Sequence, residues 1–349
     1  MRLVNKNILL ISPEPWDHLF VSKHHYAIEL CRKGNQVFFL NPPNGEFSVR
    51  KTKYENLSVI DYKGFVKGLY YYPKWIRKRE VSKVFRKLER LSQCKFDILW
   101  SFDNSVFFDL DTLSKEVLKI SHIVDLNQDF QTARAATSAN ICFGVIPSIV
   151  DRLKQYNNYS FLIPHGVELH LKEISRVHLP GEKKKKALYF GNLAMPHLNW
   201  LLLKKALETF TEVDFILLGS HHDKVPLDGY SNLHLLQPVE ASHLSDYMAA
   251  VDTLFLFYSA EYLTSYASPH KLLEYFSSGK PVVSNAFPEY DKYGDLIYQA
   301  NNDKEWLTNF SMAITETDPQ KSKQRIDIAL ANTYEHRIGE IEQLLNTLR

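Results

Sequence analysis

The sequence has few cysteines and no long hydrophobic run. Its three cysteines, Cys31, Cys94 and Cys142, are odd in number and far apart among 349 residues. Such a set does not indicate a disulfide framework or a zinc site, and it fits a reducing compartment. No stretch reaches the roughly 18 apolar residues of a membrane span, and the apolar run near the N-terminus is too short for a signal peptide. We therefore expect a cytoplasmic protein.

A dinucleotide fingerprint is also missing. No G-x-G-x-x-G follows the first apolar segment and no P-loop is present, so an NAD-type Rossmann enzyme is not expected. The net charge is only +2, which argues against general binding of nucleic acid. Apolar residues make up 45% and charged residues 23%, as in ordinary globular proteins, and the length suggests two domains.

Short apolar segments alternate with longer helical patterns along the chain. Strands that are apolar on both faces are typical of a buried parallel sheet, and the alternation predicts doubly wound α/β domains. The expected strands are 7–12, 36–41, 96–102, 120–126, 141–148, 160–166, 186–192, 213–220, 233–239, 252–258 and 280–285. The expected helices are 22–33, 80–92, 196–209, 241–250 and 268–279.

A polar, basic segment at 169–186 separates the strands into two sets. It contains a Pro-Gly pair, and we interpret it as a linker between an N-terminal domain, 1–168, and a C-terminal domain, 187–329. The last segment, 330–349, carries apolar residues on one helical face and is expected to be an amphipathic helix.

The stretch "SPHKLLEYFSSGKPVVSN", 268–285, combines a capped helix with a buried strand. Ser268 is a good N-cap, and Lys271 and Glu274 are three residues apart, so they share one side of the helix near His270. The N-terminal end of a helix together with a lysine attracts an anion, and a carboxylate accepts hydrogen bonds from a diol. These features predict a diphosphate beside a ribose. A surface Lys–Glu pair has the same spacing, but the flanking apolar strands favour a ligand site.

The same stretch resembles the sugar-donor motif of GT-B glycosyltransferases of the family 4 type, in the variant P-x-K-x-x-E-Y-x-A-x-G-K-P-V-V. Further similar segments are 12–43, 161–168, 187–193, 215–220 and 232–258. The resemblance implies a GT-B fold, with two facing Rossmann-like doubly wound parallel-sheet domains. It also implies that the C-terminal helix, 330–349, crosses back to the first domain.

The family resemblance implies a nucleotide-diphospho-sugar donor in the C-terminal domain and an acceptor against the N-terminal one. The implied donor-binding residues are Gly191, Asn192, Ser220, Gln237, Val239, Ser268, His270, Lys271, Leu272 and Glu274. Glu274 would bind the ribose diol, and Lys271 would lie at the phosphates. No metal or other cofactor is required in this family, and retention of configuration is its default.

Two features depart from the family pattern. Many members carry a second glutamate eight residues before the ribose-binding one, where this chain has Tyr266. The usual basic residues after the turn at Gly191 are absent from "GNLAMPHLNW", 191–200. Two alternatives therefore stay open: a catalytically inactive subunit that binds a nucleotide or a glycan, and a sugar-nucleotide epimerase.

Other candidate residues lie outside the donor motif. Trp16 and His24 are candidates for contact with a sugar in the cleft, with a loop anchor and a solvent-facing helix residue as the respective alternatives. Asp129 follows an interior strand and is expected to act as a base or to bind the sugar. His165 is expected at the cleft, although it would also suit an anchor of the linker. The predicted catalytic residues are Asp129, His165 and Lys271.

Positive charge is concentrated between Arg50 and Arg90. This segment holds 13 Lys and Arg and 4 Asp and Glu, a net charge of +9 in a chain of +2. Within it, 70–91 combines aromatic residues with an amphipathic basic helix, which suits an anionic membrane surface. A helix docked on the sheet with a solvated basic face would show the same pattern.

Together these features predict a glycosyltransferase of the hexosyltransferase type. It would transfer a sugar from a nucleotide-diphosphate donor to a glycan or lipid-linked acceptor in the biosynthesis of a cell-surface polysaccharide. We expect it in the cytoplasm, peripherally on the inner face of the membrane, without nucleic acid as a partner.

Overall fold

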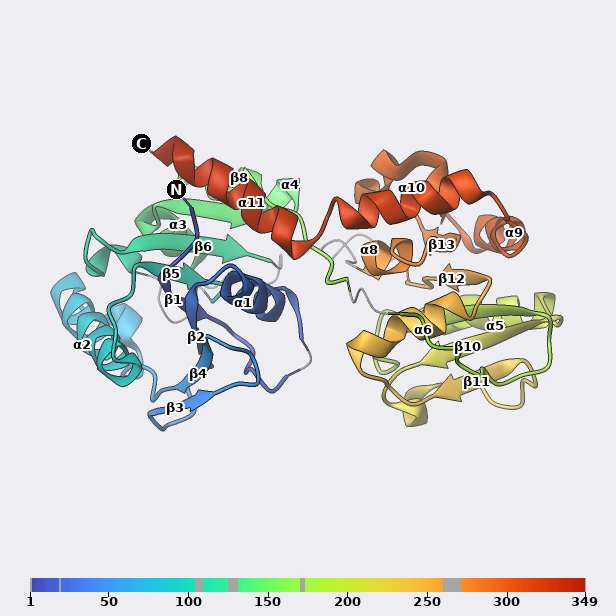
Figure 1. Ribbon diagram of the computed structural model, residues 1–349, viewed down its shortest axis with the longest axis horizontal. Coiled ribbons are helices and arrows are strands. Elements are labelled where there is room, and N and C mark those ends of the chain that lie inside the picture. The colour runs from blue at the N-terminus through green and yellow to red at the C-terminus, as the bar shows by residue number, and fades with distance from the viewer. Residues whose placement is uncertain are drawn as a thin grey trace. The chain divides into compact units, whose positions relative to one another are not determined.

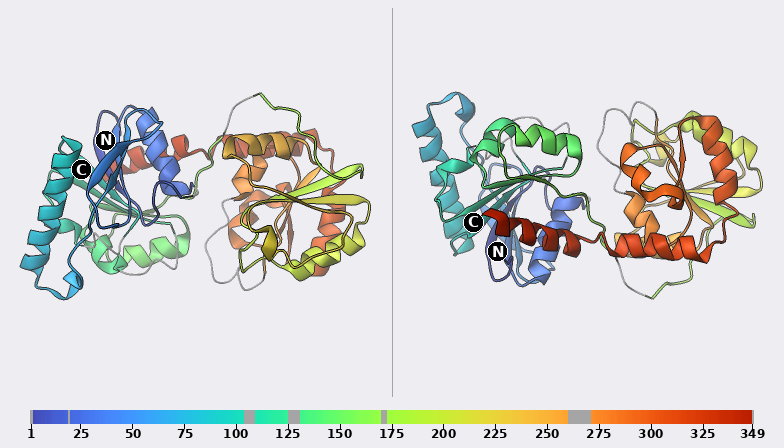
Figure 2. Two further views of the ribbon diagram at one scale, coloured as in Figure 1. Left: turned by 90° about the horizontal axis from the view of Figure 1, so that it is seen from below. Right: turned by 90° about the horizontal axis from the view of Figure 1, so that it is seen from above.

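The computed structural model describes residues 2–18, 20–103, 109–124, 131–169, 173–259 and 271–348. The chain divides into two compact units (Figure 1). Unit 1 contains Met1–Gly166 and Tyr334–Arg349, and unit 2 contains Val167–Thr333. Each unit is a largely parallel sheet with helices on both faces (Figure 2), so the predicted α/β class is confirmed.

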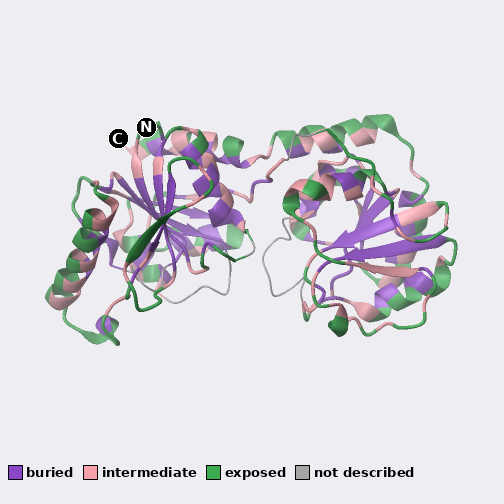
Figure 3. Cartoon of the chain, turned by 60° about the horizontal axis from the view of Figure 1, so that its bottom comes forward, coloured by how far each residue is buried: buried purple, intermediate pink, exposed green. Residues whose placement is uncertain are grey.

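Unit 1 is built on an eight-stranded sheet in the order β3-β4-β2-β1-β5-β6-β7-β8. Its strands are β1 (Asn7–Ile11), β2 (Gln36–Leu40), β3 (Ser48–Lys51), β4 (Leu57–Asp61), β5 (Ile98–Ser101), β6 (Leu118–Ile123), β7 (Ile141–Gly144) and β8 (Ser160–Leu162). All neighbours are parallel except β3, which runs antiparallel to β4. The central strands are almost fully buried because they are apolar on both faces, whereas the edge strand β3 is exposed (Figure 3).

The helices of unit 1 include the last helix of the chain. They are α1 (Ser22–Arg32), α2 (Lys74–Ser92), α3 (Thr132–Ser138), α4 (Pro147–Lys154) and α11 (Tyr334–Leu345), with short 3₁₀ turns η1 (Leu69–Tyr71), η2 (Leu110–Thr112) and η6 (Asn346–Leu348). The Tyr334 ring of α11 stacks on His25 of α1 at 5.0 Å. The Glu342 carboxylate accepts hydrogen bonds from the Leu3 N–H at 2.6 Å and the Lys33 ammonium at 3.2 Å. The C-terminal helix therefore crosses back to the first unit, as the fold class predicts.

Unit 2 is a six-stranded parallel sheet in the order β11-β10-β9-β12-β13-β14. Its strands are β9 (Lys185–Phe190), β10 (Val213–Leu218), β11 (Leu233–Leu236), β12 (Thr253–Phe255), β13 (Val282–Asn285) and β14 (Tyr298–Ala300). Its helices are α5 (Trp200–Thr209), α6 (Leu244–Ala249), α8 (Lys271–Phe276), α9 (Asp303–Ala313) and α10 (Pro319–Leu330), with 3₁₀ segments η3 (His222–Lys224), η4 (Ala241–His243) and η5 (Pro288–Leu296). One apolar core extends through the unit.

The segment predicted as a linker, 169–186, instead packs on unit 2 where it is described. The Asp246 carboxylate accepts a hydrogen bond from the Ser175 N–H, and the Asp214 carboxylate accepts one from the Lys183 N–H, both at 2.9 Å. Leu179 lies in the core of unit 2. The two ends of unit 2 are joined to each other, because the Val167 N–H donates to the Asn332 carbonyl at 2.9 Å.

The structure contains several strands and helices that the sequence patterns did not predict. Strands β3, β4 and β14 and helices α3, α4, α9 and α10 are additional to the prediction. Helix α4 begins at Pro147, inside a stretch predicted as strand, because proline suits the first turn of a helix. Among the described helices, none is both long and apolar enough to cross a membrane.

Candidate functional site

Helix α8 is fixed to the sheet of unit 2 by four buried side chains. These are Leu272, Leu273, Tyr275 and Phe276. Lys271 and Glu274, three residues apart, are only partly buried, so they share the side of the helix that remains open. The Tyr275 ring packs on Phe190 at the end of β9, with ring centroids 5.0 Å apart. Burial raises the pKa of Tyr275 well above its ordinary value, so its phenol stays neutral.

The Lys271 ammonium lies against the turn that follows β9. Its Nζ donates a hydrogen bond to the Tyr189 hydroxyl at 3.1 Å and lies 4.7 Å from the centroid of the same ring, within cation–π range. Gly191, at the start of the turn, has φ +152°, and a Cβ added there would overlap Lys271 Nζ. The glycine therefore makes room for the ammonium, which lies at the end of a parallel strand.

A second glycine, Gly219, packs closely against the backbone of the turn at Gly191. A Cβ added to Gly219 would overlap the carbonyl oxygen of Gly191. The Gly191 N–H donates to the Leu218 carbonyl at 2.9 Å, and the Gly219 N–H donates to the Leu236 carbonyl at 2.9 Å. The turns after β9 and β10 are thus packed together at the carboxyl edge of the sheet, where open α/β folds bind their ligands.

The structure brings the other predicted loop residues to the same edge. Asn192 is exposed, and its Oδ1 accepts a hydrogen bond from the Ala194 N–H at 2.9 Å. The Ser220 hydroxyl lies 2.9 Å from His221 Nδ1. Gln237 is exposed after β11, and Val239, two residues later, is half-buried. These residues gather because they follow neighbouring parallel strands.

Four residues named in the sequence analysis lie outside the residues that the structure describes. Ser268, His270 and Tyr266 lie in the segment 260–270, and Asp129 lies in 125–130; both segments are outside the described residues. Their proposed roles stay predictions.

The described side chains of the site suit an anion. Among the residues that the structure describes, no group of three or more His, Cys, Asp or Glu is arranged to hold a metal ion. An ammonium beside a glycine turn suits a phosphate, and Glu274 adds a carboxylate that accepts hydrogen bonds from hydroxyl groups.

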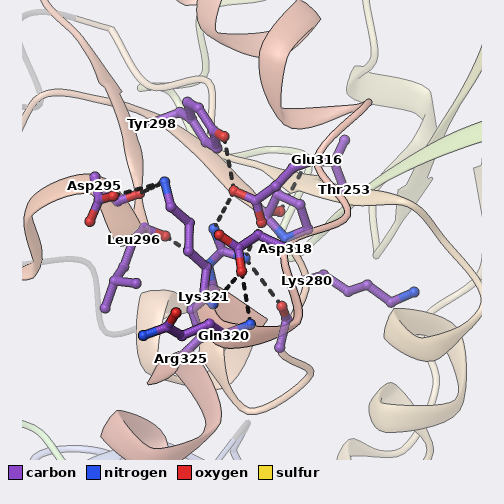
Figure 4. A network of polar contacts seen from close by, with 12 residues as sticks. Thr253, Lys280, Asp295, Leu296, Tyr298, Glu316, Asp318, Gln320, Lys321 and Arg325 are labelled. Carbon is purple, nitrogen blue, oxygen red and sulfur yellow. Dashed lines mark hydrogen bonds and ion pairs between the residues drawn. The ribbon is translucent and has the colours of Figure 1, made fainter. Parts of the chain in front are cut away.

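A buried arginine fixes the far end of α8 (Figure 4). The Arg325 side chain is fully buried and donates to the Leu296 carbonyl at 2.8 Å and the Gly279 carbonyl at 3.3 Å. It also forms a bidentate pair with the Glu316 carboxylate, at 2.6 and 2.9 Å. The Tyr298 hydroxyl donates to the same carboxylate at 2.9 Å, and burial, then this contact, raises the pKa of Tyr298 to about 12. The network holds the turn that follows α8 against α10 and so supports the helix that carries Lys271.

In unit 1, the prediction that Trp16 and His24 contact a sugar is wrong for this structure. The Trp16 side chain is 6% exposed and the His24 side chain is fully buried. His24 Nε2–H donates to the Pro15 carbonyl at 3.2 Å, and its Nδ1 accepts from the Val21 N–H at 3.2 Å, so both ring nitrogens are used. Burial lowers the pKa of His24 to about 4. The two side chains anchor the loop after β1, with ring centroids 5.5 Å apart.

His165 lies near the point where the chain leaves unit 1. Its Nδ1 is 2.8 Å from the Ser22 hydroxyl at the start of α1, and the side chain is half-buried. The Arg337 guanidinium of α11 lies 3.5 Å from the His165 carbonyl oxygen. These contacts fix the position of His165 within unit 1, and a catalytic role stays a prediction.

The apolar stripe predicted within 70–91 does not face a membrane. Val81, Phe85 and Leu88 are buried in the core of unit 1, and Val84 packs against that core. Helix α2 is therefore docked on the sheet, which was the alternative interpretation of this segment. Its basic side, Trp75 in its first turn and the tyrosine residues before it remain exposed.

Comparison with solved structures finds the same architecture across the whole chain. A sucrose-phosphate synthase from Thermosynechococcus elongatus is 13% identical and matches with a TM-score of 0.68 over 98% of this chain and 99% of its own. An E. coli structure named trehalose-6-phosphate, bound with UDP-2-fluoro glucose, is 11% identical, with a TM-score of 0.65 over 97% of this chain and 98% of its own. The chain has the GT-B fold.

An α,α-trehalose 6-phosphate synthase from Burkholderia multivorans shares the GT-B fold, at 10% identity and a TM-score of 0.62 over 98% of this chain and 99% of its own. At such identities the similarity establishes the fold alone. No family model and no curated protein sequence matches the chain.

Sequence reasoning missed the two tyrosines around the Lys271 ammonium. Tyr189 accepts its hydrogen bond, and the centroid of the Tyr258 ring lies 6.0 Å away. A partial signal exists for Tyr189, because alternation along a strand directs residues 189 and 191 to the same side. No local pattern connects either residue with a lysine more than ten residues further along the chain.

Proposed function

We propose that the chain is a glycosyltransferase that moves a sugar from a nucleotide-diphosphate donor to a glycan or lipid-linked acceptor. The observation that carries the proposal is the position of the Lys271 ammonium, held by Tyr189 against the turn at Gly191. This arrangement at the carboxyl edge of a parallel sheet suits the diphosphate of a sugar nucleotide. Glu274, on the same side of α8, suits the ribose diol.

The proposed catalysis is mainly electrostatic. As the acceptor hydroxyl oxygen bonds to C1 of the sugar, the bond between C1 and the diphosphate breaks, and Asp129 is the proposed base that takes the hydroxyl proton. Lys271 stabilises the negative charge that develops on the departing diphosphate. Glycine at position 191 lets the ammonium and the phosphate approach the backbone without a side chain between them. Asp129 and His165 are the proposed partners on the side of the acceptor, with retention of configuration as the proposed outcome.

The names of the structural neighbours support a sugar nucleotide as donor. One is bound with UDP-2-fluoro glucose, and a UDP-forming α,α-trehalose-phosphate synthase from Burkholderia xenovorans is in complex with glucose-6-phosphate. We further propose a UDP-linked hexose as donor, an enzyme of the family 4 type, and a role in cell-surface polysaccharide biosynthesis at the cytoplasmic face of the membrane. The basis is the motif at 268–285 for the family type, the names of the structural neighbours for the UDP-linked donor, and the basic segment 50–90 for the membrane face.

One observation favours the alternative function of a catalytically inactive subunit that binds a nucleotide or a glycan. The turn 191–200 contains no Lys or Arg. In the described part of unit 2, the positive charge at Gly191 therefore comes from Lys271. With Lys271 as the cation of the described part of the site, the chain would still bind a nucleotide as a non-catalytic subunit. A sugar-nucleotide epimerase is the remaining alternative, and it requires no acceptor.

A thermal-shift panel tests the donor site. The ligands are UDP-, GDP-, ADP-, CMP- and dTDP-linked sugars, and the proteins are the wild type, Glu274→Ala and the control Glu212→Ala, whose side chain is 86% exposed. Binding at 100 times Kd stabilises a protein by about 2.7 kcal/mol. We expect a shift with one nucleotide class that is lost in Glu274→Ala and kept in the control. No shift with any nucleotide would contradict the proposal.

Turnover of the selected sugar nucleotide then separates the three functions. Release of nucleoside diphosphate that depends on a membrane lipid or glycan extract indicates transfer. Epimerised sugar without any acceptor indicates the epimerase. Binding without either product, over a series of acceptor extracts, indicates the non-catalytic subunit.

A further inference from the structure

The loop before α2 and the first turn of α2 hold aromatic side chains in solvent. Tyr71 is 82% exposed and Trp75 is 68% exposed, while Tyr70 and Tyr72 are 40% and 43% exposed. The rings of Tyr70 and Tyr71 are in contact, with centroids 4.3 Å apart. Exposed aromatic residues that lie close together along the chain are unfavourable in water and favour a surface that binds a partner.

The backbone of this loop is anchored, so the exposed rings are held in place. Leu69 is buried in the core of unit 1, and Gly68, with φ +69°, allows the turn that precedes it. On the other side, the Arg77 guanidinium donates to the Tyr72 carbonyl at 2.7 Å and pairs with the Asp109 carboxylate. The rings therefore project from a fixed base and do not need to be ordered on binding, which lowers the entropic cost.

The outer side of α2 continues this surface with positive charge. At 3.6 residues per turn, Trp75, Arg79, Lys83 and Arg86 lie on one side of the helix. The buried residues Val81, Phe85 and Leu88 lie on the opposite side. Helix α2 is green on this outer side in Figure 3, which marks it as exposed. We call Tyr71, Trp75, Arg79, Lys83 and Arg86 the docking face.

The charge of the docking face is not compensated by nearby carboxylates. Helix α2 contains eight basic and two acidic residues. Its paired cations are Lys74 and Arg77, which bind Asp111 and Asp109 at the edge of the helix. Among the residues that the structure describes, no carboxylate pairs with Arg79, Lys83 or Arg86. These three side chains remain available to an anionic partner.

We propose that unit 1 binds the surface of an anionic lipid bilayer through the docking face. Tryptophan and tyrosine side chains prefer the headgroup region, where one part of the ring system is apolar and the other is wet. Lysine and arginine near an anionic leaflet are attracted to its negative potential. The face from Trp75 to Arg86 is about 17 Å long at 1.5 Å per residue, so a flat bilayer can contact all of it.

This mode differs from that of an amphipathic helix that inserts its apolar stripe. Since the stripe of α2 is buried in unit 1, only Tyr71 and Trp75 enter the headgroup region, and the basic side chains remain at the lipid surface. A convex helix with rings at one end also differs from the positively charged groove with which proteins bind single-stranded nucleic acid. The proposal does not depend on the transfer reaction.

Vesicle flotation of the full chain tests the proposal. The vesicles are phosphatidylcholine alone and phosphatidylcholine with phosphatidylglycerol, each at low and high salt. The test variant is Arg79→Gln/Lys83→Gln/Arg86→Gln. The matched control is Lys115→Gln/Lys154→Gln/Lys304→Gln, which removes the same charge from exposed positions elsewhere on the chain. A second variant, Tyr71→Ala/Trp75→Ala, removes the rings, and circular dichroism checks that every protein is folded.

We expect binding to phosphatidylglycerol vesicles at low salt and loss of binding at high salt, where the Debye length is only about 3 Å. Each neutralised charge should weaken partitioning about fivefold, so the triple variant should weaken it about a hundredfold, with the control unchanged. The aromatic variant should also bind more weakly. Absence of vesicle binding, equal loss in the control, or binding of a soluble polyanion such as heparin without vesicle binding would each overturn the proposal.

Discussion

Replacement of Gly191 by alanine is expected to weaken nucleotide binding by displacing the Lys271 ammonium. The added Cβ would overlap Lys271 Nζ and would lie 3.0 Å from the Tyr189 hydroxyl. An ammonium that donates to a charged phosphate contributes about 2 kcal/mol net, which corresponds to a factor of about thirty in Kd. Lys271→Ala removes the same interaction and should have a similar effect.

A double-mutant cycle separates the ammonium from other roles of the glycine. Isothermal titration with UDP, or with the nucleotide that the thermal-shift panel selects, gives Kd for the wild type, Gly191→Ala, Lys271→Ala and the double variant. If alanine acts by displacing the ammonium, it has little further effect once Lys271 is gone, so the double variant should resemble the single variants.

Full additivity would refute this reasoning. A double variant weaker than the wild type by roughly a thousandfold would mean that Gly191 acts independently of Lys271. An unchanged Kd for Lys271→Ala would mean that the ammonium is not part of the site at all. Tyr189→Phe, which removes one hydrogen bond and keeps the ring, should weaken binding by about fivefold, a smaller effect than loss of the ammonium.

Two further predictions concern stability. Arg325→Met should lower the free energy of unfolding in urea by about 3–5 kcal/mol, because it leaves the Glu316 carboxylate buried without its cation; the double variant with Glu316→Met should recover part of this loss, and a fully additive double variant would contradict it. The pKa of His24 is lowered to about 4 in the folded chain, from about 6.5 when unfolded, so the unfolded state binds the proton more tightly. The contribution of neutral His24 to the free energy of unfolding should therefore be fully present above pH 6.5. The free energy of unfolding should fall by up to about 3 kcal/mol as the pH drops to 4. His122, whose pKa burial lowers to about 3, adds a loss of the same sign, and His24→Phe should flatten the profile measured by urea unfolding at each pH.

The α/β class and part of the site could be predicted because they depend on local chain geometry. Strands that are apolar on both faces are stable only when both faces are buried, so the sequence predicts β1, β9 and β10 as strands of a buried sheet. The spacing of Lys271 and Glu274 fixes them on one side of a helix whatever surrounds it. Because that helix lies between two buried parallel strands in the sequence, its N-terminal end lies at the carboxyl edge of the sheet.

Other predictions failed because periodicity shows which side of an element is apolar but not what covers it. The stripe of α2 packs on its own unit, and His24 is enclosed by the loop that its ring nitrogens support. The segment 173–186 looks like a linker by composition, yet Asp214 and Asp246 bind it to unit 2. Each outcome depends on partners that are distant in the sequence.

The alternation of strands and helices, the capped helix with its lysine and glutamate, and the basic segment before β5 all follow from local sequence. The contact of the Lys271 ammonium with Tyr189 and Gly191 requires the assembled fold, because the order of the parallel strands brings the end of β9 beside α8. The structure also decided which side of α2 faces solvent. Local spacing is a property of one segment, whereas contact between segments depends on how the whole sheet is assembled.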